Sequence, residues 1–397
     1  MEPDPMTTTE NGASRPRVLM IAFEDGRSGP CRLPRPLNEA GIAVATLAPP
    51  ANLIGRSGFV AERFTLPAAR SARSLLAALE GAVAAWQPDL VIPCDEQVVA
   101  FLHDVVRRSN ASAAVRTVLA ASLGDPGRHE ALLMKGATLA LARTIGVATP
   151  RGAIASSARE GRRIADEIGY PVYAKASFGW AGSGVTLCAD DAALSAALAR
   201  PRAAPVKALA RRLLQRDWYP ARTAIEVQQA IAGSPAMVAA VAINGRMLAG
   251  FSAMARRTVS ATGPSMVVEI LHHAPMQEAA ARMIAALGAS GFIGFDFMIE
   301  AGSGEALLLE CNPRPIQVGH LGSRIGADLC AALAAALRGE GALPAAPCAS
   351  ETVALFPAAF AHGLDATLPA HVHRDIPFDD PALLAAMTGP TEARAAA

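Results

Sequence analysis

The stretch that most constrains the fold of this chain runs from Gly291 to Gly322. It reads GFIGFDFMIEAGSGEALLLECNPRPIQVGHLG, two apolar runs on either side of a glycine-rich turn signal. Centring the turn on Ser303 makes an antiparallel hairpin with Asp296 opposite Glu310. Because successive side chains of a strand point to opposite faces, the core face is predicted to carry Phe295, Phe297, Ile299, Leu307, Leu309 and Cys311. A slip of one residue would bury the acids and expose the phenylalanines, which favours this register.

The opposite face of the hairpin carries the polar groups. Asp296 and Met298 lie there opposite Leu308 and Glu310, and Asn312 follows on the same side. Two facing carboxylates repel each other unless a cation lies between them. Carboxylates and an asparagine carbonyl oxygen are hard ligands suited to Mg²⁺. A metal site is therefore one interpretation, and the alternative on this segment alone is an exposed sheet face.

The composition indicates a globular protein with large cores. The chain has 397 residues, long enough for two or three domains, and is 52% hydrophobic and 18% charged. Its net charge of +1 gives no general reason to expect nucleic acid or a membrane surface as partner. We find no uninterrupted apolar stretch of ~18 residues, so no membrane span is predicted.

Two further features favour a cytoplasmic protein. Residues 1–16 are polar and acidic before Arg15 and lack the cationic start and apolar core of a signal peptide, so we interpret them as a disordered leader. The six cysteines are scattered without a CxxC pair, which is typical of reduced, buried thiols.

Strands and helices alternate in the first part of the chain. Short apolar strands are predicted at Arg17–Phe23, Ile42–Leu47 and Pro88–Pro93, with helices at Ser71–Trp86 and about Glu96–Arg108. This alternation is typical of a doubly wound parallel sheet. We assign it to an N-terminal domain over residues 17–125.

The rest of the chain divides into three further segments. Residues 126–232 begin with a helix over His129–Ile145 and continue as strand–turn–strand, as in a small lid. Residues 233–340 contain a hairpin around Asn244–Gly245 and the hairpin described above. Residues 341–397 form a C-terminal extension with a strand at Thr352–Phe356. The predicted fold class is α/β with an α+β lid.

A second glycine-rich stretch, FGWAGSG at Phe178–Gly184, joins two predicted strands, and Lys175 lies on the first. It is not a P-loop, because no Gly-Lys-Ser/Thr follows, and it lacks the strand–turn–helix context of the dinucleotide fingerprint. Glycines let backbone N–H groups approach phosphate oxygens, and the lysine adds a positive charge. The alternative is an ordinary glycine-rich hairpin tip.

The order of these features resembles the ATP-grasp superfamily of carboxylate–amine ligases, whose members include D-alanine–D-alanine ligase, biotin carboxylase and carbamoyl phosphate synthetase. The resemblance extends from Arg17 to Arg338 and is most specific at LLLECNPRP following GFDFM. It implies an N-terminal doubly wound domain, a central lid and a C-terminal antiparallel-sheet domain that binds Mg²⁺ and ATP.

The resemblance also implies site residues. The metal ligands would be Asp296, Glu310 and Asn312, and the catalytic residues would be Arg314, Lys175 and Arg257. The nucleotide-binding residues would be Lys135, Lys175, Ser177, Gly179, Gly182, Ser183, Gly184, Gln228, Gln229, Ala230 and Ile231. The chain departs from the pattern at the hinge, since many relatives have a glutamate at position 228 or 229 and an acid where this chain reads Ser234–Ala236.

The implied activity is an ATP- and Mg²⁺-dependent ligase, with Mn²⁺ as an alternative ion. It would activate a small-molecule carboxylate as an acyl phosphate and join it to an amine, as in an amino-acid or peptide ligase of secondary metabolism. Homodimers are common in the superfamily. The alternatives are a bicarbonate-activating enzyme, a thiol ligase and a non-catalytic nucleotide-binding relative.

Four other residues stay open between a site role and a structural one. His320 and Arg324 follow the NPR segment and would line an acceptor pocket or stabilise a loop. Asp95 and Glu96 follow a strand at its carboxyl end, where open α/β sheets bind ligands.

Overall fold

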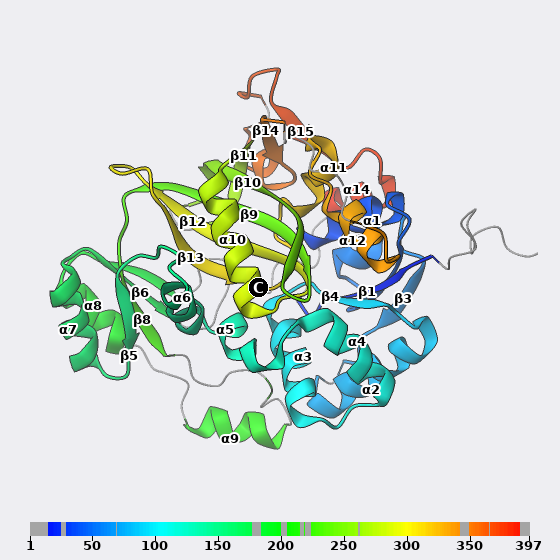
Figure 1. Ribbon diagram of the computed structural model, residues 1–397, viewed down its shortest axis with the longest axis horizontal. Helices are drawn as coiled ribbons and strands as arrows, with labels where there is room; N and C mark the ends of the chain where they lie inside the picture. Colours follow the sequence, from blue (N-terminus) through cyan, green and yellow to red (C-terminus); the bar gives the residue numbers. More distant parts are fainter. Residues whose placement is uncertain are drawn as a thin grey trace, which may run out of the picture.

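The protein is built on three β-sheets (Figure 1). The computed structural model describes residues 15–24, 29–68, 70–176, 184–199, 205–214, 218, 224–260, 263–341, 349–364 and 366–389. Within these ranges no helix is both long and apolar enough to cross a membrane.

The first sheet is parallel throughout, as predicted. Its strand order is β3-β2-β1-β4, from β1 (Arg17–Ile21), β2 (Ala43–Ala48), β3 (Glu62–Thr65) and β4 (Leu90–Pro93). Its helices are α1 (Pro34–Glu39), α2 (Ala72–Trp86), α3 (Glu96–Arg108) and α4 (Ala113–Leu123). The Ser71 and Asp95 side chains cap α2 and α3 by accepting from backbone N–H groups of the first turn.

The helix predicted over residues 129–145 is in fact two helices. α5 (His129–Leu133) ends where Met134 adopts an extended backbone (φ −111°, ψ 114°), and α6 (Lys135–Thr144) begins directly after it. Leu133 and Met134 pack against the core of the first sheet, whereas Leu132 packs in the core of the third. The break lets one short segment serve two cores and places Lys135 at the start of a helix.

The second sheet is antiparallel, in the order β5-β8-β6-β7. It comprises β5 (Gly152–Ala155), β6 (Val172–Ala176), β7 (Val185–Cys188) and β8 (Ile225–Gln229). Helices α7 (Ala158–Ile168) and α8 (Asp191–Ala199) cover one face, where Val172, Ala174 and Val227 form a small core with them. The alternate residues Lys175, Glu226 and Gln228 therefore point away from these helices. α9 (Pro205–Leu213) follows α8 in the chain.

The third sheet has seven strands in the order β13-β12-β9-β10-β11-β14-β15. They are β9 (Gly233–Ile243), β10 (Arg246–Thr258), β11 (Ser265–Leu271), β12 (Gly291–Glu300), β13 (Ala306–Asn312), β14 (Glu351–Leu355) and β15 (His373–Asp375). The predicted Asn244–Gly245 turn is present, with left-handed φ angles of 49° and 75°. The C-terminal segment thus supplies two strands to the sheet that carries the β12–β13 hairpin.

Helices cover both faces of this third sheet. α10 (Ala274–Leu287) packs on the face that carries Val238 and Ala240. α12 (Leu329–Leu337) packs on the face that carries Ala239 and Val241. The remaining short helices are α11 (Gly322–Ile325), α13 (Ala358–Ala361) and α14 (Pro381–Thr388).

The hairpin of β12 and β13 has the predicted Asp296–Glu310 pairing but contains a bulge. Beyond that pair, Phe297 lies opposite Leu308, so Leu309 is the extra residue. Leu308, and not Leu309 as predicted, therefore joins Phe295 and Phe297 in the core. At the bulge the Leu308 N–H donates to the carbonyl of Ala148, from a distant part of the chain.

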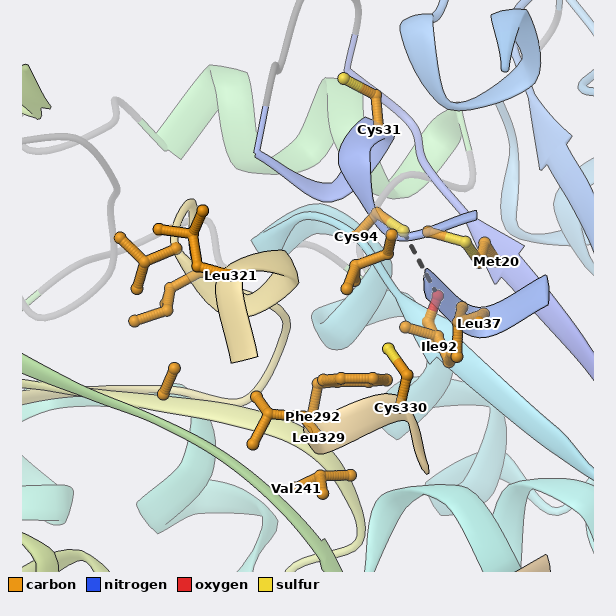
Figure 2. Close-up of a cluster of buried hydrophobic side chains, with 14 of the residues drawn as sticks. Met20, Cys31, Leu37, Ile92, Cys94, Val241, Phe292, Leu321, Leu329 and Cys330 are labelled. Carbon is orange, nitrogen blue, oxygen red and sulfur yellow. Dashed lines mark hydrogen bonds between the residues drawn. The ribbon is translucent and has the colours of Figure 1, made fainter. Parts of the chain in front are cut away.

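The first and third sheets share one hydrophobic core, which fixes them to each other. Figure 2 shows Met20 and Ile92 of the first sheet close to Phe292, Val241 and Leu329 of the third sheet and its helix. The cysteines of the described residues are all buried and none of them forms a disulfide, namely Cys31, Cys94, Cys188, Cys311 and Cys330. Cys348 lies outside the described residues.

Candidate functional site

One pocket brings together polar residues from three parts of the chain. Glu96 comes from the first turn of α3, Lys135 from the start of α6, and Glu310 and Asn312 from β13. The empty space is about 370 Å³ and is partly open to solvent. Apolar residues complete the wall, among them Val99, Leu132, Leu133, Cys311 and Pro313. Sequence-distant charges therefore converge in a partly apolar cleft.

Lys135 and Glu310 form an ion pair in this pocket. The Lys135 Nζ atom lies 2.8 Å from Glu310 Oε2, and Lys135 is only 9% exposed. Because the helix breaks at Met134, Lys135 begins α6, and its side chain reaches Glu310 on β13. The predicted phosphate-binding lysine and predicted metal ligand are thus in direct contact.

Asp296 and Asn312 lie on the same hairpin and are hydrogen-bonded. Asn312 Nδ2 donates to Asp296 Oδ2 at 3.1 Å, and Arg314 Nη2 donates to Asn312 Oδ1 at 3.3 Å. Burial, and next the charge of Glu310, raise the pKa of Asp296 to about 6. Two acids are therefore held close enough to repel.

This donor set fits a hard divalent cation. Two carboxylates and an amide oxygen are the ligand types that Mg²⁺ takes, and it commonly completes its shell with water and phosphate oxygens. No cluster of three or more histidine, cysteine, aspartate and glutamate side chains able to hold a metal occurs in the described part of the chain. Asn312 stays the predicted third ligand, and its amide oxygen now accepts from Arg314.

Arg314 is anchored by an acid from the other side of the cleft. Its Nε atom donates to Glu96 Oε1 at 2.8 Å, and the two side chains are 14% and 12% exposed. The carbonyl of Pro315 accepts a further hydrogen bond from Arg314. Glu96, which the sequence left between two roles, is thus a member of the site.

The lid lysine Lys175 also faces this region. Its ammonium donates to Gln228 Oε1 on the neighbouring strand. Burial lowers the pKa of Lys175, Glu226 opposes this effect, and the charges of Lys135, Glu310 and Asp296 act on the pKa as well. Glu226, two residues before Gln228 on β8, is 2% exposed, and no sequence pattern indicated a role for it.

Several other predicted residues do not line the pocket or lie outside the described residues. Arg257 is exposed on β10 and does not line the pocket. Gln229 accepts hydrogen bonds from Arg151, and Ala230 and Ile231 are half-buried after β8. Gly184 precedes β7 with φ 76°. Ser177, Gly179, Gly182 and Ser183 lie outside the described residues.

His320, Arg324 and Asp95 have structural partners. His320 Nε2 lies 2.9 Å from Asp375 Oδ2, and Arg324 pairs with Glu351, so both hold the C-terminal segment. Asp95 accepts from the backbone N–H groups of Phe23, Glu24 and Val98. These contacts favour the structural alternative for all three.

Comparison with known proteins gives one family match. The family model of the carbamoyl-phosphate synthase L chain ATP-binding domain matches residues 135–336, which include every residue of the hairpin and both lysines. A search of curated proteins found no match.

Solved structures share the fold at low identity. The chain is similar to the biotin carboxylase domain dimer of Hydrogenobacter thermophilus 2-oxoglutarate carboxylase, solved with MgADP and bicarbonate (16% identity, TM-score 0.59, covering 83% of this chain and 71% of that one). It is also similar to an L-amino acid ligase from Bacillus licheniformis (16%, TM-score 0.57, 86% and 80%). A third similar structure is the N5-carboxyaminoimidazole synthetase from Staphylococcus aureus with ADP (12%, TM-score 0.59, 85% and 81%).

Proposed function

Because this chain belongs to the ATP-grasp superfamily, through its match to the carbamoyl-phosphate synthase ATP-binding domain, we propose that it is a ligase that activates a carboxylate as an acyl phosphate. The superfamily consists of ATP-dependent ligases and carboxylases. The observation that carries the proposal is the convergence of Lys135, Glu310, Asn312 and Glu96-bound Arg314 at one cleft.

The proposed reaction has two steps. A carboxylate oxygen attacks the γ-phosphorus of ATP, the bond to the β-phosphate oxygen breaks, and ADP leaves. An amine nitrogen then attacks the acyl carbon, inorganic phosphate leaves, and the nitrogen loses a proton to give an amide. ATP supplies the free energy for a bond that does not form from the free acid and amine.

The residues in and around the cleft would supply positioning and charge, which is most of what phosphoryl transfer requires of a protein. Lys135 and Lys175 would hold phosphate oxygens, and Arg314 would balance the charge of the acyl phosphate. Asp296, Glu310 and Asn312 would hold Mg²⁺, which when bound neutralises phosphate charge. The apolar wall around Val99 and Leu132 would limit the access of water to the acyl phosphate.

A second candidate is activation of bicarbonate in place of an organic acid. It is favoured by the similar biotin carboxylase domain, whose complex contains bicarbonate. The amino-acid ligase among the similar structures favours the first candidate. Both use the same phosphate-transfer residues and differ in the acid.

Hydroxylamine trapping tests the proposal and separates the candidates. The protein is incubated with ATP, Mg²⁺ and hydroxylamine against pools of amino acids and other carboxylic acids. Hydroxamate together with ADP is expected, and the positive pool identifies the acid. Turnover that requires only bicarbonate would favour the second candidate. Formation of AMP would mean adenylation and contradict both.

A further inference from the structure

Three polar side chains form a chain on the inner face of the second sheet. Lys175 donates to Gln228 Oε1, and Gln228 Nε2 donates to Glu226 Oε1 at 3.4 Å. Gln228 is 1% and Glu226 is 2% exposed. Lys175 also lies directly opposite Glu226 in the β6–β8 ladder. We call these three residues the lysine relay.

Glu226 is the member that the proposed reaction does not use. Its Oε2 atom is buried and has no hydrogen-bond partner among the described residues. A buried carboxylate oxygen without a donor lowers stability, so natural proteins rarely keep one without a use. Burial raises the pKa of Glu226, and the charge of Lys175 is the largest effect that opposes this rise. The carboxylate and the ammonium therefore stabilise each other's charged forms.

The donors and acceptors of these three side chains can pair in only one way. A lysine ammonium can only donate, so it must meet the carbonyl oxygen of Gln228. An ionised glutamate can only accept, so it must meet the amide nitrogen. The 3.4 Å separation is long for a hydrogen bond, which leaves the attraction between the carboxylate charge and the amide dipole as its main component. Glu226 thus fixes the amide with its oxygen directed at Lys175.

We propose that Glu226 is a positioning residue for Lys175, which it holds through Gln228 where the phosphates of a nucleoside diphosphate bind. The inference rests on the proposed function, because that function places phosphates at Lys175. Gln228 separates the carboxylate from this position, so the anionic phosphates do not meet the Glu226 charge directly. The Glu226 carboxylate thus compensates the charge of the Lys175 ammonium, while the Gln228 side chain lies between the two groups.

The test compares a ligand with phosphates to one without. Glu226→Gln keeps the shape and an acceptor oxygen but removes the charge. We expect its Kd for MgADP, measured by calorimetry, to rise about tenfold, as for the loss of one charge-assisted interaction. Its Kd for adenosine should stay within about twofold of the wild type. Glu167→Gln, on the exposed side of α7 in the same part of the chain, is the matched control and should change neither.

A charge swap supplies the second measurement. Glu226→Gln combined with Gln228→Glu restores one carboxylate and brings it into direct contact with Lys175. Its Kd for MgADP should return to within about threefold of the wild type. If Glu226 only stabilised the fold, moving its carboxylate to position 228 would not restore the affinity for MgADP.

The outcomes separate this inference from the proposed function. Wild-type protein that binds MgADP while Glu226→Gln binds it equally well overturns the relay alone. An equal loss for MgADP and adenosine also overturns it, since that result indicates a packing role or a contact with the base. A charge-swapped variant that does not recover MgADP binding also overturns the relay. Wild-type protein that fails to bind MgADP overturns the nucleotide site and the relay together.

Discussion

Arg314 holds Glu96 across the cleft, with Arg314 Nε 2.8 Å from Glu96 Oε1. The two residues are 218 positions apart in the chain, and both side chains are largely buried. Since Glu96 begins α3 and Arg314 follows β13, their ion pair joins the first sheet's helices to the β12–β13 hairpin. One contact thus attaches the first sheet to the third and orients the arginine that the proposed reaction uses.

Removing Arg314 alone should lower both stability and activity, whereas removing Arg314 and Glu96 together should restore stability but not activity. Arg314→Met leaves Glu96 buried without its main cation, and we expect a loss of about 3 kcal/mol in the free energy of unfolding. Adding Glu96→Gln should recover most of that loss, because no buried charge remains. Hydroxamate formation should stay at least about 100-fold below the wild type in both variants. Urea denaturation and the trapping assay measure the two effects.

The control for that pair is Arg163→Met, which removes an exposed ion pair with Glu167. It should change the unfolding free energy by less than about 0.5 kcal/mol. Recovery of hydroxamate formation in the double variant of Arg314 and Glu96 would contradict the assigned role of Arg314.

Removing one acid of the β12–β13 hairpin should abolish the increase in ADP affinity that Mg²⁺ causes. It should also stabilise the metal-free protein. Asp296→Asn relieves the repulsion from Glu310, so we expect a gain of about 1 kcal/mol in unfolding free energy without Mg²⁺. The same variant should bind ADP with an affinity that no longer rises when Mg²⁺ is added. Calorimetry with and without Mg²⁺ measures this, and Glu305→Gln, in the turn of the same hairpin, is the control. An unchanged Mg²⁺ response would exclude Asp296 as a ligand.

Local sequence patterns predicted what depends on local chemistry. The pairing of Asp296 with Glu310 follows from alternation around one turn, and the start of α2 follows from the capping side chain of Ser71. These features need no information from distant parts of the chain, since each is decided within about a dozen residues.

The features that the sequence did not predict depend on contacts between distant segments. The bulge at Leu309 accompanies a backbone hydrogen bond from Leu308 to Ala148. The break at Met134 occurs where one helix meets two different cores. The Glu96–Arg314 pair joins α3 to the segment after β13. No local pattern contains these partners, so propensity and periodicity could not identify them.

A buried histidine pair should make stability depend on pH. The rings of His103 and His129 stack with centroids 3.8 Å apart, and His103 is 4% exposed. Burial, and then the neighbouring His129, lower the pKa of His103 well below 6.5. Burial also lowers the pKa of His129, which Asp125 partly opposes. The folded protein therefore disfavours the charged form of both rings, most strongly that of His103.

The sign of the effect follows from proton uptake. As the pH falls below about 6.5, the unfolded chain binds protons that the folded protein does not, so the folded state loses stability. The loss should approach about 1.4 kcal/mol per pH unit for His103. His103→Gln should flatten this dependence between pH 6.5 and 5 in urea denaturation, whereas exposed His362→Gln should not. A wild-type stability independent of pH in this range would contradict the prediction.

The C-terminal segment should contribute to stability without contributing to nucleotide binding. Asp375 on β15 accepts from Arg32, 3.0 Å away, and lies 2.9 Å from His320 Nε2. Burial alone would raise the pKa of Asp375, but the His320 and Arg32 contacts hold the pKa below its usual value. The carboxylate is thus stabilised in its charged form by groups from two other parts of the chain.

Asp375→Asn should leave Arg32 buried without its counter-charge, and we expect a loss of about 3 kcal/mol in unfolding free energy at neutral pH. The difference from the wild type should shrink as the pH falls below about 3.9, because the unfolded chain then binds a proton at this carboxyl while the folded protein still keeps the carboxylate charged. The Kd for MgADP should not change, since the cluster does not line the pocket. Asp379→Asn removes the exposed partner of Arg35 and serves as the control. Weaker MgADP binding in Asp375→Asn would show instead that the C-terminal strands help to position the residues that follow Arg314.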